Sequence, residues 1–299
     1  MLPANIGSMQ TVEEKAWAKI NLTLDIIGKR PDGYHELLTV FQALALHDTL
    51  SLSRNNTGMI TLSVGNAPLP TDGTNLAGRA ARLLQKQYGI QEGVHIILDK
   101  KIPIAAGLGG GSSDAAAVLR GLVRLWRLPL ERDTLYSLAE TLGSDVPFCL
   151  EGGTALGRGR GEKVEILPPC PHFFVVLANP GFAVSTAAVY QAFRLHETRE
   201  RPDTEAMCAA IASGDRSAVG AHLNNVLETA TFPLFPKVGE LKSRMSLAGS
   251  ALMCGSGPTV FALFHDRGEA VELYRALQQE GCSAWLTQTV AGNLLEVGK

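Results

Sequence analysis

The sequence has no excess of positive charge, no long hydrophobic run and no apolar core in its first residues, and each absence argues against a class of protein. Its formal net charge is −2 at pH 7, whereas a general nucleic-acid binder carries a basic excess or a basic stripe. The longest clean apolar run, Phe173 to Ala178, is far too short to span a bilayer. Met1 to Glu14 lacks the apolar core of a secretory signal, so we expect a short irregular leader there, with Met9 as an alternative start.

Cysteine is also scarce. The five cysteines are an odd number with no close pairing, which favours buried, reduced thiols in a cytoplasmic protein over a disulfide framework or a zinc site. They are Cys149, Cys170, Cys208, Cys254 and Cys282.

What is present is typical of a globular protein, with 45% hydrophobic and 19% charged residues. A length of 299 residues indicates two domains or one large one. The proline-rich stretch from Pro168 to Pro171 breaks the periodic pattern. We therefore expect an N-terminal domain over residues 1–168 and a C-terminal domain over residues 169–299.

Strand-like and helix-like segments are interleaved in both halves, which indicates an α/β or an α+β protein. The expected strands are Glu13 to Ile27, Asp48 to Ser53, Met59 to Val64, Val94 to Leu98, Phe173 to Ala178, Thr259 to Phe264 and Ala284 to Thr289. The expected helices are Asn75 to Tyr88, Asp114 to Trp126, Arg132 to Leu142, Thr186 to Leu195, Thr204 to Ser213, Gly220 to Leu227, Lys237 to Ala248 and Arg267 to Glu280.

The most informative segment is a glycine-rich loop between an apolar strand and a helix. Glycine lets the backbone turn through positive φ and approach a ligand closely, and a helix N-terminus favours an anion. A flexible linker is the alternative, but linkers are usually polar on both sides. We therefore expect a phosphate cradle made of Pro103, Ile104, Ala105, Ala106, Gly107, Leu108, Gly109, Gly110, Gly111, Ser112 and Ser113. Ser112 and Ser113 are expected to cap the helix, and their hydroxyls could bind phosphate or Mg²⁺.

The cradle is not one of the common kinds. A Walker loop needs a lysine after its glycines, and none follows here. A dinucleotide fingerprint counted from Gly107 and Gly109 would need a third small residue where Ser112 stands, and the match is imperfect. The companion motifs of a protein kinase do not occur. A nucleotide-dependent dehydrogenase is therefore disfavoured.

Three separated segments resemble those of the GHMP kinases, small-molecule kinases that include galactokinase, homoserine kinase and mevalonate kinase. We call these segments the first motif (Lys19 to Leu22), the second motif (Pro103 to Ser113) and the third motif (Cys254 to Thr259). Longer strings are similar to the members that act on a cytidyl diphosphate alcohol. These strings are Ala18 to Leu22, Arg30 to His35, Gly143 to Phe148 and Gly152 to Gly161.

The resemblance implies an α+β fold of two domains, with mixed sheets covered by helices and the active site in the cleft between them. It implies an ATP-dependent kinase with a small-molecule cytidyl diphosphate substrate, acting as a monomer or weak homodimer. No Cys/His metal constellation stands out in the sequence, so the expected metal is Mg²⁺ carried by ATP.

The resemblance also implies the catalytic pair, with Asp145 as the base and Lys19 as its partner. A carboxylate can accept the proton of an attacking hydroxyl, and an ammonium can stabilise the phosphoryl oxygens. From the residues alone, Asp145 reads as a helix N-cap and Lys19 as a solvated strand lysine. The second reading is weakened because Ile20 and Leu22 indicate a buried strand, where an unpaired lysine is costly.

At the acceptor end, the resemblance implies that Tyr34 and Tyr190 stack on the base, that His35 hydrogen-bonds to it, and that Asn21 contacts the substrate. Ordinary packing is the alternative for the tyrosines, and a strand asparagine that bonds to the backbone is the alternative for Asn21. The third motif, with Gly255, Ser256 and Gly257, would close the site from the second domain, and a simple turn is its alternative.

Two further expectations concern charged residues. We expect Asp114 to compensate the dipole of the helix while pointing away from the ligand. Arg158 and Arg160 either face substrate phosphates or form a solvated basic loop.

Two rivals remain within this fold: another GHMP kinase, such as homoserine or mevalonate kinase, and a sensor that binds ligand without turnover. The tyrosine and histidine that follow Asp32 and Gly33 argue against the first. A sensor has no need of a base, so the presence of both Lys19 and Asp145 argues against the second.

Overall fold

The structure, a computed structural model, describes residues 11–65, 67–129, 131–292 and 295. The expected leader therefore lies mostly outside the described residues, as does Met9. Where the structure does describe it, from Thr11 to Glu14, the chain is already part of the first strand.

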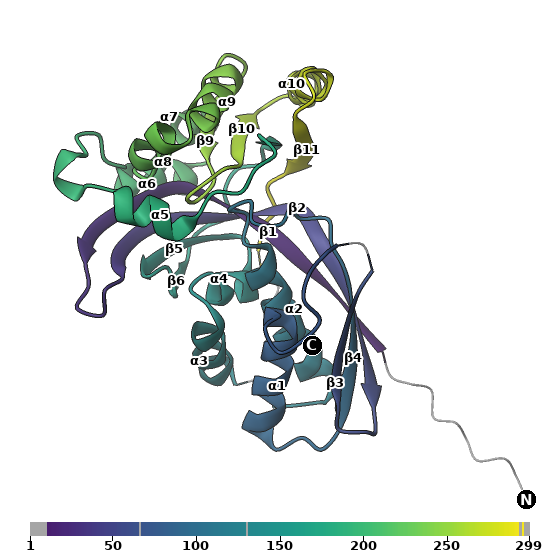
Figure 1. The fold of residues 1–299 in the computed structure, drawn as a ribbon. Helices are drawn as coiled ribbons and strands as arrows, with labels where there is room; N and C mark the ends of the chain where they lie inside the picture. Colours follow the sequence, from purple (N-terminus) through teal and green to yellow (C-terminus); the bar gives the residue numbers. More distant parts are fainter. Residues whose placement is uncertain (1–10, 66, 130, 293–294, 296–299) are drawn as a thin grey trace, which may run out of the picture.

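A long antiparallel hairpin, seen as the purple and blue ribbons of Figure 1, is the backbone of the first sheet. The sheet has the order β3-β4-β2-β1-β8, and a further hairpin, β5 and β6, pairs with β2. The register of the long hairpin shifts between Trp17 and Lys19 and again between Asn21 and Thr23. The strands are β1 (Thr11–Lys29), β2 (His35–Asn55), β3 (Ile60–Val64), β4 (Gly93–Asp99), β5 (Thr154–Gly159), β6 (Lys163–Ile166) and β8 (Asn224–Asn225).

Four helices pack against this sheet and against one another, and Figure 1 shows them gathered below the hairpin. The helices are α1 (Leu76–Tyr88), α2 (Gly110–Leu125), α3 (Arg132–Leu142) and α4 (Val146–Glu151). Apart from its first few residues, α2 is almost completely buried, because its alanines let it lie close to both α1 and the strands. The sheet thus positions the glycine loop, which enters α2 directly.

The second sheet has the order β11-β7-β10-β9 and is antiparallel throughout. Its strands are β7 (Phe174–Asn179), β9 (Ser250–Met253), β10 (Val260–Phe264) and β11 (Ser283–Gln288). The helical elements of this part are α5 (Thr186–Ala192), the 3₁₀ turn η1 (Leu195–Glu197), α6 (Thr204–Ser213), α7 (Arg216–Ala221), α8 (Glu228–Leu234), α9 (Pro236–Ser246) and α10 (Arg267–Gln279).

Strand β7 packs on both of its faces and so joins the two parts of the molecule. Val175 and Leu177 pack in one buried cluster with Ile20 and Val40 of the long hairpin. Val176, on the opposite face, packs with residues of α9 and α10. A strand with two apolar faces buries one against the first sheet and the other under helices. The observed class is α+β, with two sheets and covering helices, as predicted.

The second sheet is built entirely from residues after 169, but β8 belongs to the first sheet, where Asn224 pairs with Thr23. The boundary between residues 1–168 and 169–299 stays a prediction. No helix of the part that the structure describes is long and apolar enough to cross a membrane.

The helix expected over Gly220 to Leu227 is wrong. Helix α7 already ends at Ala221, and the chain then forms the two-residue strand β8 before α8 begins at Glu228. The Asn225 side chain accepts the N–H of Leu227 and donates to the Gly255 carbonyl, so it competes with helical hydrogen bonding. The helix expected over Thr186 to Leu195 is also too long, since α5 stops at Ala192.

Candidate active site

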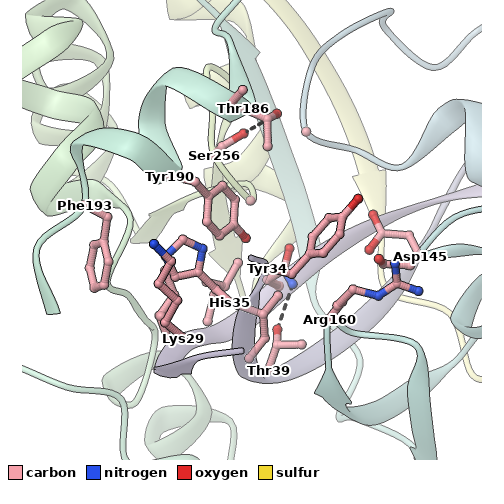
Figure 2. Close-up of a pocket in the computed structure, with 18 of the residues that line it drawn as sticks. Lys29, Tyr34, His35, Thr39, Asp145, Arg160, Thr186, Tyr190, Phe193 and Ser256 are labelled. Carbon is pink, nitrogen blue, oxygen red and sulfur yellow. Dashed lines mark hydrogen bonds between the residues drawn. The ribbon is translucent and has the colours of Figure 1, made fainter. Parts of the chain in front are cut away.

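A cavity of about 1170 Å³ opens between the two parts of the molecule and collects residues from both. From the first part it takes residues of β1 and β2, of the glycine loop, and of the turn before α4. From the second part it takes the segment from Thr186 to Glu197 and the third motif at Gly255 and Ser256. Figure 2 shows side chains from both parts pointing into it.

The three motifs expected from the resemblance meet at one edge of this cavity. The backbone N–H of Lys19 donates to the Leu108 carbonyl at 3.0 Å, which joins the first motif to the second. A Cβ at Gly107 would stand 2.4 Å from the Cys254 carbonyl oxygen, so only glycine allows the second motif to reach the third. A Cβ at Gly255 would lie 3.6 Å from the Gly107 carbonyl oxygen.

Lys19 and Asp145 form an ion pair at the cavity wall. Lys19 Nζ lies 3.3 Å from Asp145 Oδ2, and the lysine side chain is 6% exposed while the aspartate side chain is 31% exposed. Burying an ammonium without a partner is costly, and the ion pair with Asp145 offsets part of the cost of burying Lys19. Asp145 occupies the N-cap position of α4 but makes no capping hydrogen bond within the described part of the chain. The capping alternative is therefore not supported.

A buried hydrogen-bond relay orients Lys19. Lys19 Nζ donates to Asn21 Oδ1 at 3.0 Å, and Asn21 Nδ2 donates to Thr39 Oγ1 at 2.7 Å. The Thr39 hydroxyl in turn donates to the Thr23 carbonyl at 2.6 Å. Each polar group of the relay is satisfied, which fixes the amide of Asn21 and, through it, the ammonium.

The glycine loop leads into α2, whose N-cap is Gly109 with φ of +71°. The helix starts at Gly110, so Ser112 and Ser113 lie inside it and do not cap it, contrary to expectation. The left-handed glycine already sets the helix entry, which leaves the serine hydroxyls for other partners. Ser112 faces the cavity, whereas the buried hydroxyl of Ser113 donates to the Trp17 carbonyl.

The other loop residues divide by exposure, and their assignment to phosphate binding stays a prediction. The side chains of Ala106 and Leu108 are buried in the core between the two sheets. The exposed members of the loop are Ile104, Ala105 and Gly111.

Asp114 was expected to compensate the dipole of α2. Its side chain is instead buried, and Asp114 Oδ2 lies 2.7 Å from Lys100 Nζ.

The rings of Tyr34, His35 and Tyr190 also line the cavity (Figure 2). The His35 and Tyr190 rings lie 5.2 Å apart, tilted by 36°, while Tyr34 is 57% exposed, with the Arg160 guanidinium 5.2 Å from its ring centroid. Burial, with a smaller effect of Lys29, lowers the pKa of His35, which favours its neutral imidazole. Burial and the nearby Asp145 charge raise the pKa of Tyr190. A neutral, partly apolar surface of this kind suits a nucleobase.

The third motif supplies Gly255 and Ser256 to the cavity, and the Ser256 hydroxyl lies 2.9 Å from that of Thr186. Gly257 is a turn residue behind them: its N–H donates to the Cys254 carbonyl at 2.8 Å, and φ is +89°. Asn225 Nδ2 holds the motif from outside by donating to the Gly255 carbonyl at 2.7 Å.

Arg158 and Arg160 have different surroundings. Arg158 is an exposed residue of β5, while Arg160, at the tip of the β5–β6 hairpin, lines the cavity. Among the described residues no group of three or more His, Cys, Asp or Glu could hold a metal ion.

Several residues of the site were missed by sequence reasoning. Thr39 and Asn225 act through partners on distant strands, and only the strand pairing reveals them. Thr186 could have been found from the Ser185 N-cap that starts α5 in front of it. Ser144 lines the cavity inside a string that the resemblance already covered.

Comparison with known proteins agrees with this geometry. Residues 75–153 match the model of the GHMP kinases N terminal domain, and residues 207–283 match that of the GHMP kinases C terminal domain. The chain belongs to the GHMP kinase family. It is 49% identical over 270 residues to the 4-diphosphocytidyl-2-C-methyl-D-erythritol kinase of Exiguobacterium sibiricum, covering 90% of this chain and 94% of that one. It is 45% identical to the enzyme of that name from Bacillus subtilis, covering 89% and 92%.

Solved structures of the GHMP kinase family share the fold. A crystal structure of 4-(cytidine 5'-diphospho)-2C-methyl-D-erythritol kinase superimposes with a TM-score of 0.81 at 38% identity, covering 94% of this chain and 100% of that one. The homoserine kinase of Cytophaga hutchinsonii gives a TM-score of 0.75 at 20% identity, over 97% and 98%. The second likeness concerns the fold alone.

Proposed function

We propose that this chain transfers the γ-phosphoryl group of ATP to the 2-hydroxyl of 4-diphosphocytidyl-2-C-methyl-D-erythritol, giving the 2-phosphate and ADP. The reaction belongs to the non-mevalonate route to isoprenoid precursors. The observation that carries the proposal is the Lys19–Asp145 pair, which lies in one cavity with a glycine cradle and an aromatic wall. Two relatives that are named for this substrate, and that match this chain over more than nine tenths of their own length, support the choice of acceptor.

Asp145 is the proposed base. Its carboxylate accepts the proton of the acceptor hydroxyl while that oxygen bonds to the γ-phosphorus and the bond to the departing ADP oxygen breaks. Lys19 holds the carboxylate in place and offers positive charge to the phosphoryl oxygens. Asn21 keeps the ammonium in position through the relay to Thr39.

The glycine loop is the proposed cradle for the ATP phosphates. A Cβ at Gly107 or Gly109 would lie within 3.0 Å of atoms of Cys254 or Lys19, so these two glycines let the loop pack against the other two motifs at the cavity. Ser112 faces the cavity and fits a phosphate oxygen or Mg²⁺, whereas the Ser113 hydroxyl is already committed to Trp17. Mg²⁺ bound with ATP would neutralise charge on the phosphate oxygens.

The aromatic wall is the proposed cytidine site. The exposed ring of Tyr34 and the ring of Tyr190 offer faces for stacking, and neutral His35 can exchange a hydrogen bond with the base edge. Gly255 and Ser256 would close the site from the second part, with Gly257 shaping their turn. Arg160 lines the same cavity and would face the substrate diphosphate.

We further propose that the enzyme acts in the cytoplasm as a monomer or weak homodimer, with a small molecule as its partner. All five cysteines are free thiols, which supports a reducing compartment.

The test is an assay that couples ADP release to a signal and offers the cytidyl methylerythritol, mevalonate and homoserine separately. The proposal expects turnover with the cytidyl compound alone. Turnover with mevalonate or homoserine instead would make the chain a different GHMP kinase. Nucleotide binding without any turnover would favour a sensor.

A further inference from the structure

A buried cluster of three charged side chains holds both ends of the glycine loop, and the proposed mechanism does not use it. Lys100 directly follows β4, Asp48 lies on β2, and Asp114 lies near the start of α2. Lys100 Nζ lies 2.5 Å from Asp48 Oδ2 and 2.7 Å from Asp114 Oδ2. The three side chains are between 0% and 6% exposed, so solvent does not screen these contacts.

The second oxygen of Asp48 holds the backbone at the loop entry. Asp48 Oδ1 accepts the N–H of Lys101 at 2.5 Å and that of Ile102 at 2.8 Å. The chain is thereby bonded to β2 immediately before Pro103. Lys100 also reaches the loop exit, since a Cβ at Gly110 would stand 3.2 Å from its Nζ. One ammonium thus connects the point where the loop starts with the helix where it ends.

We propose that Asp48, Lys100 and Asp114 are positioning residues for the nucleotide. They fix the entry of the loop against the N-terminus of α2 and so set the direction of the N–H groups that meet the ATP phosphates. The inference rests on the proposed function, because it takes ATP as the ligand of the loop. A glycine-rich loop is conformationally permissive, and holding both its ends lowers the ordering cost of binding.

The cluster also explains why an acidic residue, Asp114, can lie beside the proposed binding site for the ATP phosphates. An unpaired carboxylate at Asp114 would repel the phosphates, whereas one paired with Lys100 does not. Burial lowers the pKa of Lys100, but the charges of Asp114 and Asp48 outweigh it and leave that pKa raised. The lysine therefore stays an ammonium. Burial, and to a smaller extent the charge of Asp48, raise the pKa of Asp114 although Lys100 lowers it, so the negative charge beside the phosphates is reduced further.

The experiment compares Lys100→Met and Asp114→Asn with Lys100→Arg, which keeps the charge, and with Lys101→Met, which removes an exposed neighbouring lysine. The KM for ATP and for the cytidyl acceptor, kcat and the melting temperature are measured for each. Calorimetric titration with a non-hydrolysable ATP analogue gives nucleotide affinity independently of the acceptor.

We expect Lys100→Met and Asp114→Asn to raise the KM for ATP about 10-fold, with a matching loss of analogue affinity, because a small misplacement of binding groups is costly. The KM for the acceptor should stay within about twofold, Lys100→Arg should recover part of the loss, and Lys101→Met should match wild type. If Lys100→Met does not fold, the isosteric Asp114→Asn carries the test.

A lower melting temperature with unchanged KM for ATP would overturn the proposal, as would an equal rise in both KM values, since the cluster would then serve only the fold. Failure of the proposed function looks different. A wild-type protein that binds the ATP analogue but phosphorylates no offered acceptor contradicts the acceptor assignment, and the affinity series still tests the cluster.

Discussion

The side chain of Lys19 runs against Gly109, so that a Cβ at this glycine would stand 2.9 Å from Lys19 Cγ and 3.3 Å from Cε. Gly109 also has φ of +71°, a conformation that side chains with a Cβ rarely adopt. Two separate constraints therefore require glycine here: the backbone conformation at the start of α2, and the path of the Lys19 side chain toward Asp145.

Gly109→Ala should lower kcat by about 10-fold or more, because a methyl group would displace Lys19 from Asp145. It should also destabilise the fold by about 1–2 kcal/mol through left-handed strain. Steady-state kinetics and thermal unfolding measure the two effects.

Gly181→Ala is the matched control, because Gly181 has φ of +86° but nothing within 4 Å of the added Cβ. It should show the strain without the loss of kcat. Equal losses of kcat in the two variants would mean that contact with Lys19 is not the cause.

Asp145→Asn should lower kcat by about 10²-fold or more, because the amide cannot accept the acceptor's proton. ATP affinity should stay close to that of wild type, since the carboxylate pairs with Lys19 and is proposed to meet the acceptor hydroxyl. Single-turnover kinetics and calorimetric titration with ATP separate the two. Asp133→Asn, an exposed change in α3, controls for loss of charge. Turnover of Asp145→Asn at the wild-type rate would show that the base lies elsewhere.

Local pattern was enough for much of the fold and for one wall of the site. Apolar periodicity and end signals predicted α1 and α10 closely, and the glycine spacing predicted a loop that enters a helix. The meeting of Lys19 with Asp145 could not be read from spacing, because it depends on how β1 packs beside α4. The family resemblance supplied that pair.

What sequence reasoning missed has a common physical cause. Strand β8 has two residues, too few to show a periodic pattern of apolar residues. It forms because it pairs in parallel with β1 at the edge of the sheet. The side chain of Asp114 was expected to face the helix dipole, but its partner Lys100 comes from another element and decides its direction. In each case a tertiary contact overrides a weak local preference.

Tyr34→Ala should raise the KM for the cytidyl acceptor by about 10-fold or more while leaving the KM for ATP nearly unchanged, since base stacking on an aromatic ring contributes about 1–3 kcal/mol. The ring is well placed for this because it is exposed in the cavity and has Arg160 beside it. Tyr34→Phe keeps the ring and should keep the low KM. An equal rise for both substrates in Tyr34→Ala would contradict the stacking role.

Asn225→Ala should destabilise the protein by about 1–3 kcal/mol, because it leaves buried carbonyls without a donor. Asn225 Nδ2 donates to the carbonyls of Met253 and Gly255, and Oδ1 accepts the N–H of Leu227. Since Gly255 lines the cavity, the variant should also raise the KM for the acceptor, which steady-state kinetics would detect.

Asp266→Ala separates loss of stability from loss of position. Asp266 caps α10 by accepting the Glu269 N–H at 3.1 Å, and it does not line the cavity, so its removal costs about 1 kcal/mol without touching the site. A raised acceptor KM in Asn225→Ala but not in Asp266→Ala means that the short strand β8 aligns the third motif for catalysis. The same kinetic change in both variants would reduce Asn225 to a residue that serves stability alone.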